Sequence, residues 1–199
     1  MKAKARLGRS ESQQQTKERL VATAERLFLR DGYNATSIDR VAEAAGFSKG
    51  AVYSNFANKD ELCLAVLDAL HAREVAAIAT AFAAKRSMKG RLAAFEAWAE
   101  KMIGDEGWTR LEMEFAIHAR KHAKLMRELA SRDRAVRAGL SALVTAQRDG
   151  AERALDAEAV ALALLSLGIG LGFQRMIDPE ISVRVLTDVV RLLISSTAE

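Results

Sequence analysis

The stretch TSIDRVAEAAGFSKGAVYSNFANK, residues 36–59, decides the fold that this sequence predicts. Residues 37–45 repeat apolar side chains at helical spacing and follow Thr36 or Ser37, either of which can act as an N-cap. Gly46 can adopt the positive φ with which many helices end. Ser48 is a second N-cap, in front of a helix expected over residues 49–56. The stretch therefore predicts two short helices joined by a tight turn.

The second of these helices has side chains suited to lying in a DNA groove. At about 100° per residue, Val52 and Phe56 share the face that packs on the protein. The remaining positions are small or can form hydrogen bonds, and they are Lys49, Gly50, Ala51, Tyr53, Ser54 and Asn55. This is the pattern of a helix-turn-helix, whose second helix lies in the major groove.

Lys59 is a further candidate, because it stands where a helix disfavours a cation. Asn58 is the expected N-cap of the next helix, and Glu61 is its capping-box partner. A lysine opposes the helix dipole at this end, which is understandable if it faces a phosphate. The alternative is a solvated surface lysine.

Several motifs agree in order with one known family. They are Gly32-Tyr33-x-x-Thr36, Val41-Ala42-x-x-Ala45-Gly46-Phe47-Ser48-Lys49-Gly50, Val52-Tyr53-x-x-Phe56 and Asn58-Lys59-x-Glu61-Leu62. With them, residues 16–67 resemble the DNA-binding module of the tetracycline-repressor (TetR) family. The resemblance implies phosphate contacts near Thr36 and Ser37. The chain departs from the family at Ser54 and Asn55, where many members carry aromatic, basic or histidine side chains, so fewer long side chains are left to read bases.

Taken together, the motif and the resemblance give one set of expected DNA contacts. The set is Thr36, Ser37, Ser48, Lys49, Gly50, Ala51, Tyr53, Ser54, Asn55 and Lys59. A basic arm over residues 1–13, with Lys2, Lys4, Arg6 and Arg9, is expected to reach the phosphates or a minor groove. A solubilising tail is the alternative for this arm.

Composition predicts an all-α chain, since 50% of its 199 residues are hydrophobic and only one is proline. Nine helices are expected, over residues 15–30, 37–45, 49–56, 58–85, 90–103, 106–119, 122–148, 156–176 and 178–195. Residues 14–57 are expected to form the DNA-binding domain and residues 58–199 a domain for ligand binding and dimerisation. The last helix is assigned a start at Asp178-Pro179-Glu180.

The last two helices are apolar nearly all round, which predicts burial against a second copy of the chain. The expected dimer interface, also implied by the resemblance, is Gly168, Gly172, Val183, Leu186 and Val190. The alternative is that these helices form the core of a single chain. No run of 18 apolar residues occurs, and the single cysteine, Cys63, is typical of a cytoplasmic protein.

The middle of the chain holds aromatic residues and methionine at helical spacing, with a few polar groups, which is the make-up of a small-molecule pocket. The expected lining is Phe95, Trp98, Met102, Trp108, Glu112, Phe115 and His118. Ordinary core packing is the alternative reading. Residues 120–137 hold seven lysines and arginines but two acids, which suits either an anionic ligand such as an acyl-CoA or a solvated helix face.

The resulting hypothesis is a homodimeric repressor that binds a palindromic DNA operator and releases it when a small-molecule effector binds. No catalytic motif, metal-ligand spacing or cofactor loop is present, so neither an enzyme nor a metal or cofactor protein is expected. Two alternatives remain open: a helical ligand-binding protein or enzyme whose helix-turn-helix is not a specific reader, and a DNA-binding activator. The effector, the operator and the regulated genes lie beyond the sequence.

Overall fold

The computed structural model describes residues 9–147 and 155–194, and within these ranges it contains nine α-helices and no strand. The all-α prediction is therefore confirmed. The helices are α1 Arg9–Ala35, α2 Ile38–Ala45, α3 Lys49–Tyr53, α4 Lys59–Ala83, α5 Met88–Met102, α6 Glu106–Ala119, α7 Ala123–Gln147, α8 Ala157–Ile177 and α9 Arg184–Ile194. The expected arm over residues 1–13 falls mostly outside the described residues, as does the last residue of the helix expected over 122–148.

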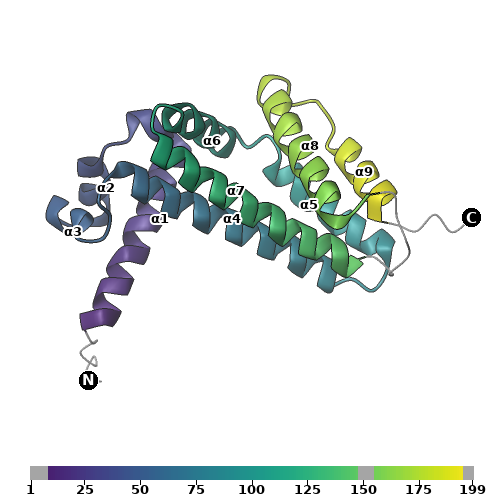
Figure 1. Cartoon of the computed structure of the whole chain (residues 1–199), viewed down its shortest axis with the longest axis horizontal. Helices are drawn as coiled ribbons and strands as arrows, with labels where there is room; N and C mark the ends of the chain where they lie inside the picture. Colours follow the sequence, from purple (N-terminus) through teal and green to yellow (C-terminus); the bar gives the residue numbers. More distant parts are fainter. Residues whose placement is uncertain (1–8, 148–154, 195–199) are drawn as a thin grey trace, which may run out of the picture.

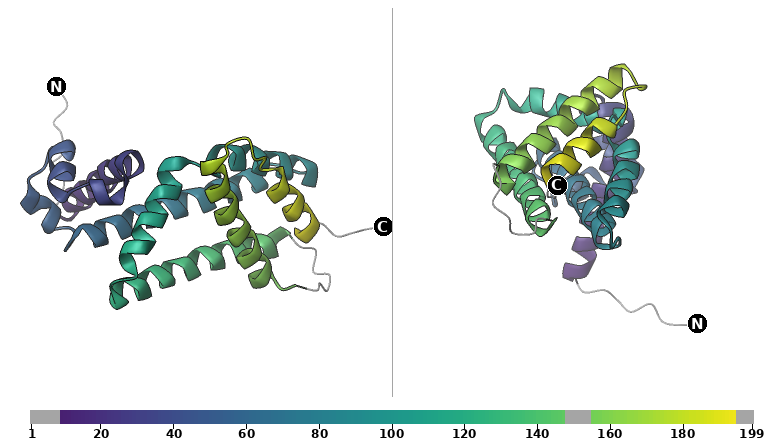
Figure 2. Two further views of the ribbon diagram at one scale, coloured as in Figure 1. Left: turned by 90° about the horizontal axis from the view of Figure 1, so that it is seen from above. Right: turned by 90° about the vertical axis from the view of Figure 1, so that its right-hand side faces the viewer.

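The helices lie along an elongated molecule, with α1, α2 and α3 at one end (Figure 1). The two long helices α4 and α7 run alongside each other away from this end, and α5, α8 and α9 surround their far halves (Figures 1 and 2). Helix α6 connects the two ends, because it packs on α1 as well as on α7 and α8.

Two clusters of buried side chains hold these ends together. The first surrounds Phe28 and Phe56 and takes in the first half of α4 together with Leu111 and Phe115 of α6. The second lies between α4, α5, α7, α8 and α9, around Phe95 and Val160. The first cluster is therefore continuous from the N-terminal helices into α4 and α6. The end formed by α1, α2 and α3, which holds the helix pair expected to read DNA and is called the reading end below, thus shares a core with the rest of the chain.

Several helix boundaries differ from the sequence-based expectation, and α1 already begins at Arg9, six residues before its expected start. Gly32 has φ 85°, as expected where a helix ends, but one further helical turn follows it to Ala35. Helix α3 stops at Tyr53 instead of Phe56. The assignment of a helix start to residues 178–180 was wrong: Asp178 ends α8 through its N–H bond to the Gln174 carbonyl, and its side chain accepts the Glu180 N–H at 3.1 Å. An aspartate before proline caps turns as readily as helices.

Most of the residues expected at a dimer interface are instead buried against other helices of the same chain. Val183, Leu186 and Val190 are buried in the second cluster. Gly172 is buried against the loop before α6, where an added Cβ would lie at an ordinary 3.6 Å from the Gly104 nitrogen. Gly168 faces Ile103 in the same way, at 3.8 Å. The expectation was wrong for Val183, Leu186 and Val190, because the single chain already buries them. Gly168 is half-buried, so its place at an interface stays a prediction.

Candidate functional site

The helix pair α2–α3 is fixed at both ends by the caps that the sequence predicted. The Ser37 hydroxyl accepts the Arg40 N–H at 3.2 Å, and Gly46 ends α2 with φ 72°. The Ser48 hydroxyl accepts the Ala51 N–H, also at 3.2 Å, and so starts α3. Satisfied helix ends of this kind hold a short helix that could not form alone.

Helix α3 rests on a fully buried support and turns its other side to solvent. Val52 and Phe56 are buried in the first cluster. Tyr53 is 48% exposed, and Lys49 is exposed with its ammonium 2.8 Å from the Asp39 carboxylate, which raises the pKa of Lys49. Ser37, Ser48, Gly50 and Ser54 are exposed as well, whereas Ala51 and Asn55 are half-buried. The exposed face therefore combines one cation, one phenol and several small polar residues.

Two of the expected DNA contacts, Thr36 and Lys59, do not belong to this face. Thr36 is 1% exposed, and its hydroxyl donates to the Gly32 carbonyl at 2.8 Å. The Lys59 ammonium donates to the Tyr33 and Thr36 carbonyls at 3.0 and 3.1 Å and lies over the Tyr33 ring. Burial lowers the pKa of Lys59. Both residues hold the link between α1 and α2. The expectation of a phosphate contact was wrong for the Thr36 side chain, which is buried, whereas for the half-buried Lys59 it stays a prediction.

A large cavity, with a volume of about 720 Å³, lies between α4, α5, α6, α7 and α8. Five of the seven residues expected to line a pocket do so, namely Phe95, Trp98, Met102, Trp108 and Glu112. The other two were wrong. Phe115 is fully buried in the first cluster, and His118 points to the Asp60 carboxylate at 3.1 Å and packs on Tyr33. The expected stripe on α6 is real, but its C-terminal end faces the reading end of the molecule.

The cavity wall is mainly apolar, and two of its polar residues, His71 and Glu74, were not expected from the sequence. His71 Nε2 and Glu112 Oε1 are 2.7 Å apart, and the Trp98 indole N–H donates to Glu74 at 2.9 Å. The Trp108 indole nitrogen is buried without a hydrogen-bond partner in the described part of the chain. His71 and Glu74 are on α4, where they are one turn apart at positions i and i+3. This spacing on a helix that was expected only to be a mechanical link is the signal that could have found them.

Comparison with known proteins identifies the helix pair. Residues 20–66 match the model of the bacterial regulatory proteins of the tetR family. The chain carries a TetR-family DNA-binding domain. It is 43% identical over 61 residues to the HTH-type transcriptional regulator TtgR of Pseudomonas putida, which is 31% of this chain and 29% of TtgR. It is 39% identical over 49 residues to the transcriptional regulator AcrR of Shigella flexneri, which is 25% of this chain and 23% of AcrR.

Solved structures extend the likeness from this TetR-family domain to the whole fold. A transcriptional regulator from Rhodococcus sp. RHA1 has a TM-score of 0.73 at 17% identity, over 91% of this chain and 97% of its own. The regulator FadR of Bacillus subtilis, solved in complex with stearoyl-CoA, has a TM-score of 0.67 at 16% identity, over 89% and 97%. These relatives and neighbours are transcriptional regulators and not enzymes, in agreement with the expectation from sequence.

Besides the continuous helix α4, α6 attaches the TetR-family domain to the rest of the molecule. The Arg110 guanidinium donates to the Leu29 and Arg30 carbonyls at 3.1 and 2.8 Å, near the end of the regular part of α1. The Glu114 carboxylate accepts the Asn34 N–H at 2.9 Å. At Gly107 the two helices are so close that an added Cβ would lie 2.4 Å from the Leu29 oxygen. Since Trp108 and Glu112 on the same helix line the cavity, α6 joins cavity and reading domain directly.

Proposed function

We propose that this protein is a homodimeric transcriptional repressor, which binds a palindromic operator and is released from it by a small-molecule effector. The observation that carries the proposal is α3, a short helix whose exposed side is polar and whose other side is anchored on Val52 and Phe56. The similarity of residues 20–66 to TetR-family regulators supports it. Such a protein acts where the DNA is, in the cytoplasm.

The proposed DNA contacts are the exposed and half-buried residues of the helix pair. Lys49 and Tyr53 supply the long side chains, and the shorter contacts come from Ser37, Ser48, Gly50, Ala51, Ser54 and Asn55. Lys49 must exchange its pairing with Asp39 for a base edge or a phosphate. That exchange costs little, because exposed ion pairs contribute about 0–1 kcal/mol.

The dimer is proposed to form through a stripe of exposed apolar side chains on the last two helices. On α8 the stripe contains Leu162, Ile169, Phe173 and Ile177, and on α9 it contains Val185 and Leu192. We call it the α8–α9 stripe. Helix α8 is long and apolar enough to cross a membrane by length and composition alone, yet only 28% of its most apolar window is buried. A second copy that packs its own stripe here forms a four-helix interface, which covers these side chains symmetrically.

A dimer supports operator recognition because two copies of α3 on a two-fold axis can reach successive major grooves, about 34–36 Å apart. The effector is proposed to bind in the cavity and to favour another position of α6. The contacts of Arg110 and Glu114 with α1 and its link would then carry the change to α3. Effector and operator must weaken each other's binding by the same coupling free energy.

The experiment that tests this function is selection of bound DNA from a random duplex pool at two salt concentrations. We expect an inverted repeat, with an affinity that falls steeply as salt rises because Lys and Arg contacts release counterions. A variant with Tyr53→Phe and Lys49→Ala should recover no repeat, whereas Lys85→Ala, at the far end of the molecule, should recover the same one. Failure of the unaltered protein to enrich any sequence at either salt would reject the proposal.

A further inference from the structure

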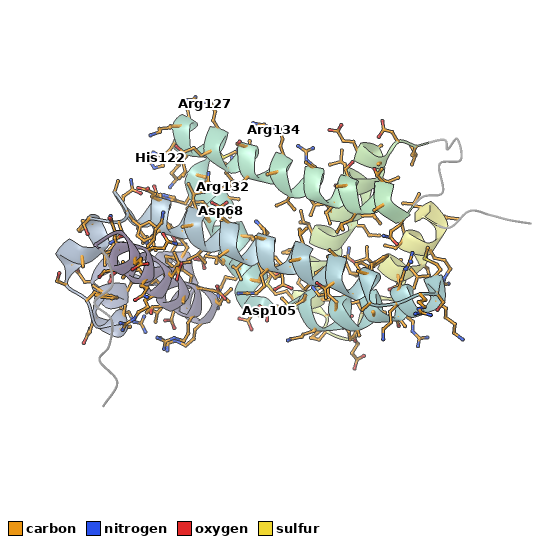
Figure 3. All side chains as sticks on the ribbon, turned by 90° about the horizontal axis from the view of Figure 1, so that it is seen from below. Asp68, Asp105, His122, Arg127, Arg132 and Arg134 are labelled. Atoms are coloured by element: carbon orange, nitrogen blue, oxygen red, sulfur yellow. The ribbon has the colours of Figure 1, made fainter. Side chains whose placement is uncertain are left out.

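The cavity wall contains more carboxylates than cations to pair with them. Its charged lining residues are His71, Glu74, Glu112, Arg132 and Asp133. Arg132 lies across from Asp68 between α7 and α4, with Nε and Oδ1 2.9 Å apart (Figure 3). Asp133 pairs with Arg137 at 3.2 Å. In each of these two pairs the positive and negative charges offset each other, and both pairs are partly solvated. The remaining acidic side chains of the lining are Glu74 and Glu112.

Glu74 is the more buried of the two, at 9% exposed. It accepts the Trp98 indole N–H and, at 3.1 Å, the Arg73 guanidinium. Arg73 also donates to Glu25 of α1 at 2.9 Å, so two carboxylates share one guanidinium. Glu112 is paired with the imidazole of His71. A buried carboxylate such as Glu74 is stable only when its charge is compensated, and its guanidinium partner is shared with Glu25. Glu112 is partly exposed, and its only partner among the described residues is an imidazole.

Aromatic rings surround these carboxylates. Trp98 stacks on Phe95 with centroids 5.4 Å apart, and Trp108 lies 6.0 Å from the His71 ring. The negative face of an indole attracts cations, and the attraction is strongest where water is excluded. The combination of indole faces with incompletely compensated carboxylates favours a positively charged ligand.

The basic run of residues 120–137 does not change this balance. Arg127 and Arg134 lie on the outer side of α7, away from the cavity, and both are exposed (Figure 3). Two donors of the wall are buried without a hydrogen bond to any residue that the structure describes, the Trp108 indole N–H and the Arg132 Nε–H. The Trp108 N–H is neutral, and the charge of Arg132 is offset by Asp68 at 2.9 Å. The solvated-face interpretation of this run is therefore the better one for Arg127 and Arg134.

We propose that the cavity binds a lipophilic cation, that is, a mainly apolar molecule with one positive charge placed between Glu74 and Glu112. The statement that such a cation is the effector rests on the proposed function. The statement that the cavity binds it rests on the cavity alone. A cation beside Glu74 competes with Arg73 for the carboxylate. Because Arg73 also holds Glu25, occupation of the cavity alters a contact with α1, which is part of the reading domain.

The test uses two probes of the same shape and opposite charge, tetraphenylphosphonium and tetraphenylborate. Both tryptophans of the chain line the cavity, so quenching of intrinsic fluorescence reports binding there. We expect saturable binding of the phosphonium, about tenfold or more tighter than that of the borate. Glu74→Gln and Glu112→Gln should each weaken phosphonium binding about tenfold while not weakening the borate. Glu128→Gln, an acid on α7 outside the cavity, is the matched control and should bind both probes as the unaltered protein does.

Circular dichroism on each variant shows whether it is folded. If Glu74→Gln is not folded, Glu112→Gln alone tests the proposal. Borate binding as tight as phosphonium binding would overturn the inference, and so would phosphonium binding unchanged in a folded Gln variant. The DNA selection is independent of this measurement. A recovered repeat together with a cavity that prefers the borate would refute the proposed ligand class and support the repressor function. Phosphonium binding without a recovered repeat would support the ligand class and refute the repressor function.

Discussion

The contact between α1 and α6 gives a sharp prediction at Gly107. An alanine Cβ there would lie 2.4 Å from the Leu29 oxygen and 3.1 Å from its carbonyl carbon. Both atoms belong to the backbone of a helix, so neither can rotate away, and α6 must move by about 1 Å to restore ordinary contact distances. Overpacking of this kind costs about 1–3 kcal/mol, and Gly→Ala in a helix returns up to about 1 kcal/mol. We expect Gly107→Ala to lower the free energy of unfolding by about 1–2 kcal/mol.

The matched control is Gly139→Ala on α7, where an added Cβ would meet the Val75 side chain at an ordinary 3.5 Å. This variant should be more stable than the unaltered protein, by up to about 1 kcal/mol. Urea unfolding followed by circular dichroism, at one fixed protein concentration, measures both changes, and Tm should fall by about 2–8 °C for Gly107→Ala. Equal stability of the two alanine variants would refute the argument that backbone contact forces a glycine at residue 107.

Three other outcomes test separate parts of the reasoning. Ile177→Asp should convert the dimer to a monomer, since Ile177 is 69% exposed in the α8–α9 stripe and does not line the cavity. Light scattering measures the mass, and an unchanged dimer would reject the stripe as the interface. Lys49→Ala should weaken operator binding and also relax base preference, which competition with mutated operators measures; a change in salt dependence alone would assign Lys49 to phosphate. Burial raises the pKa of the Cys63 thiol above its ordinary value of 9.0, so the folded chain retains a proton that the unfolded chain loses. The free energy of unfolding is therefore at its full value below pH 9 and falls above it, by up to about 1.4 kcal/mol per pH unit from this thiol. Cys63→Ala should reduce that slope between pH 9 and 10 in urea unfolding, and an unaltered slope would contradict the assignment.

The reading helix pair was predictable because its geometry needs particular residues at particular places. Ser37 and Ser48 supply the side-chain oxygens that start two helices, and Gly46 supplies the positive φ that ends one of them. Such requirements are local, so they can be read from the sequence without knowledge of the neighbouring helices. The pattern even placed Val52 and Phe56 correctly in the core.

The C-terminal half could be predicted only in part, because its outcome depends on which helix faces which. Periodicity put Trp108, Phe115 and His118 on one stripe of α6, but it could not show that the stripe passes from the cavity to the reading domain. On α8 apolar residues occur on every side, so the sequence contains no phase that separates inward Leu171 from outward Ile169. The prediction for Thr36 was wrong for a related reason. A hydroxyl near a helix start can bind a phosphate or a nearby backbone carbonyl, and here it donates to the Gly32 carbonyl.

The burial of Cys63 makes the spacing of the reading helices directly measurable. The chain has one native thiol, it is completely buried, and its raised pKa suppresses the reactive thiolate. A thiol-reactive spin label therefore finds no accessible native thiolate to react with in the folded protein. Ser54→Cys would provide a single addressable thiol on the exposed side of α3, and in a dimer the two labels form one pair. Dipolar spectroscopy on that pair, with and without a cavity ligand, would yield the distance between the two helices as a distribution.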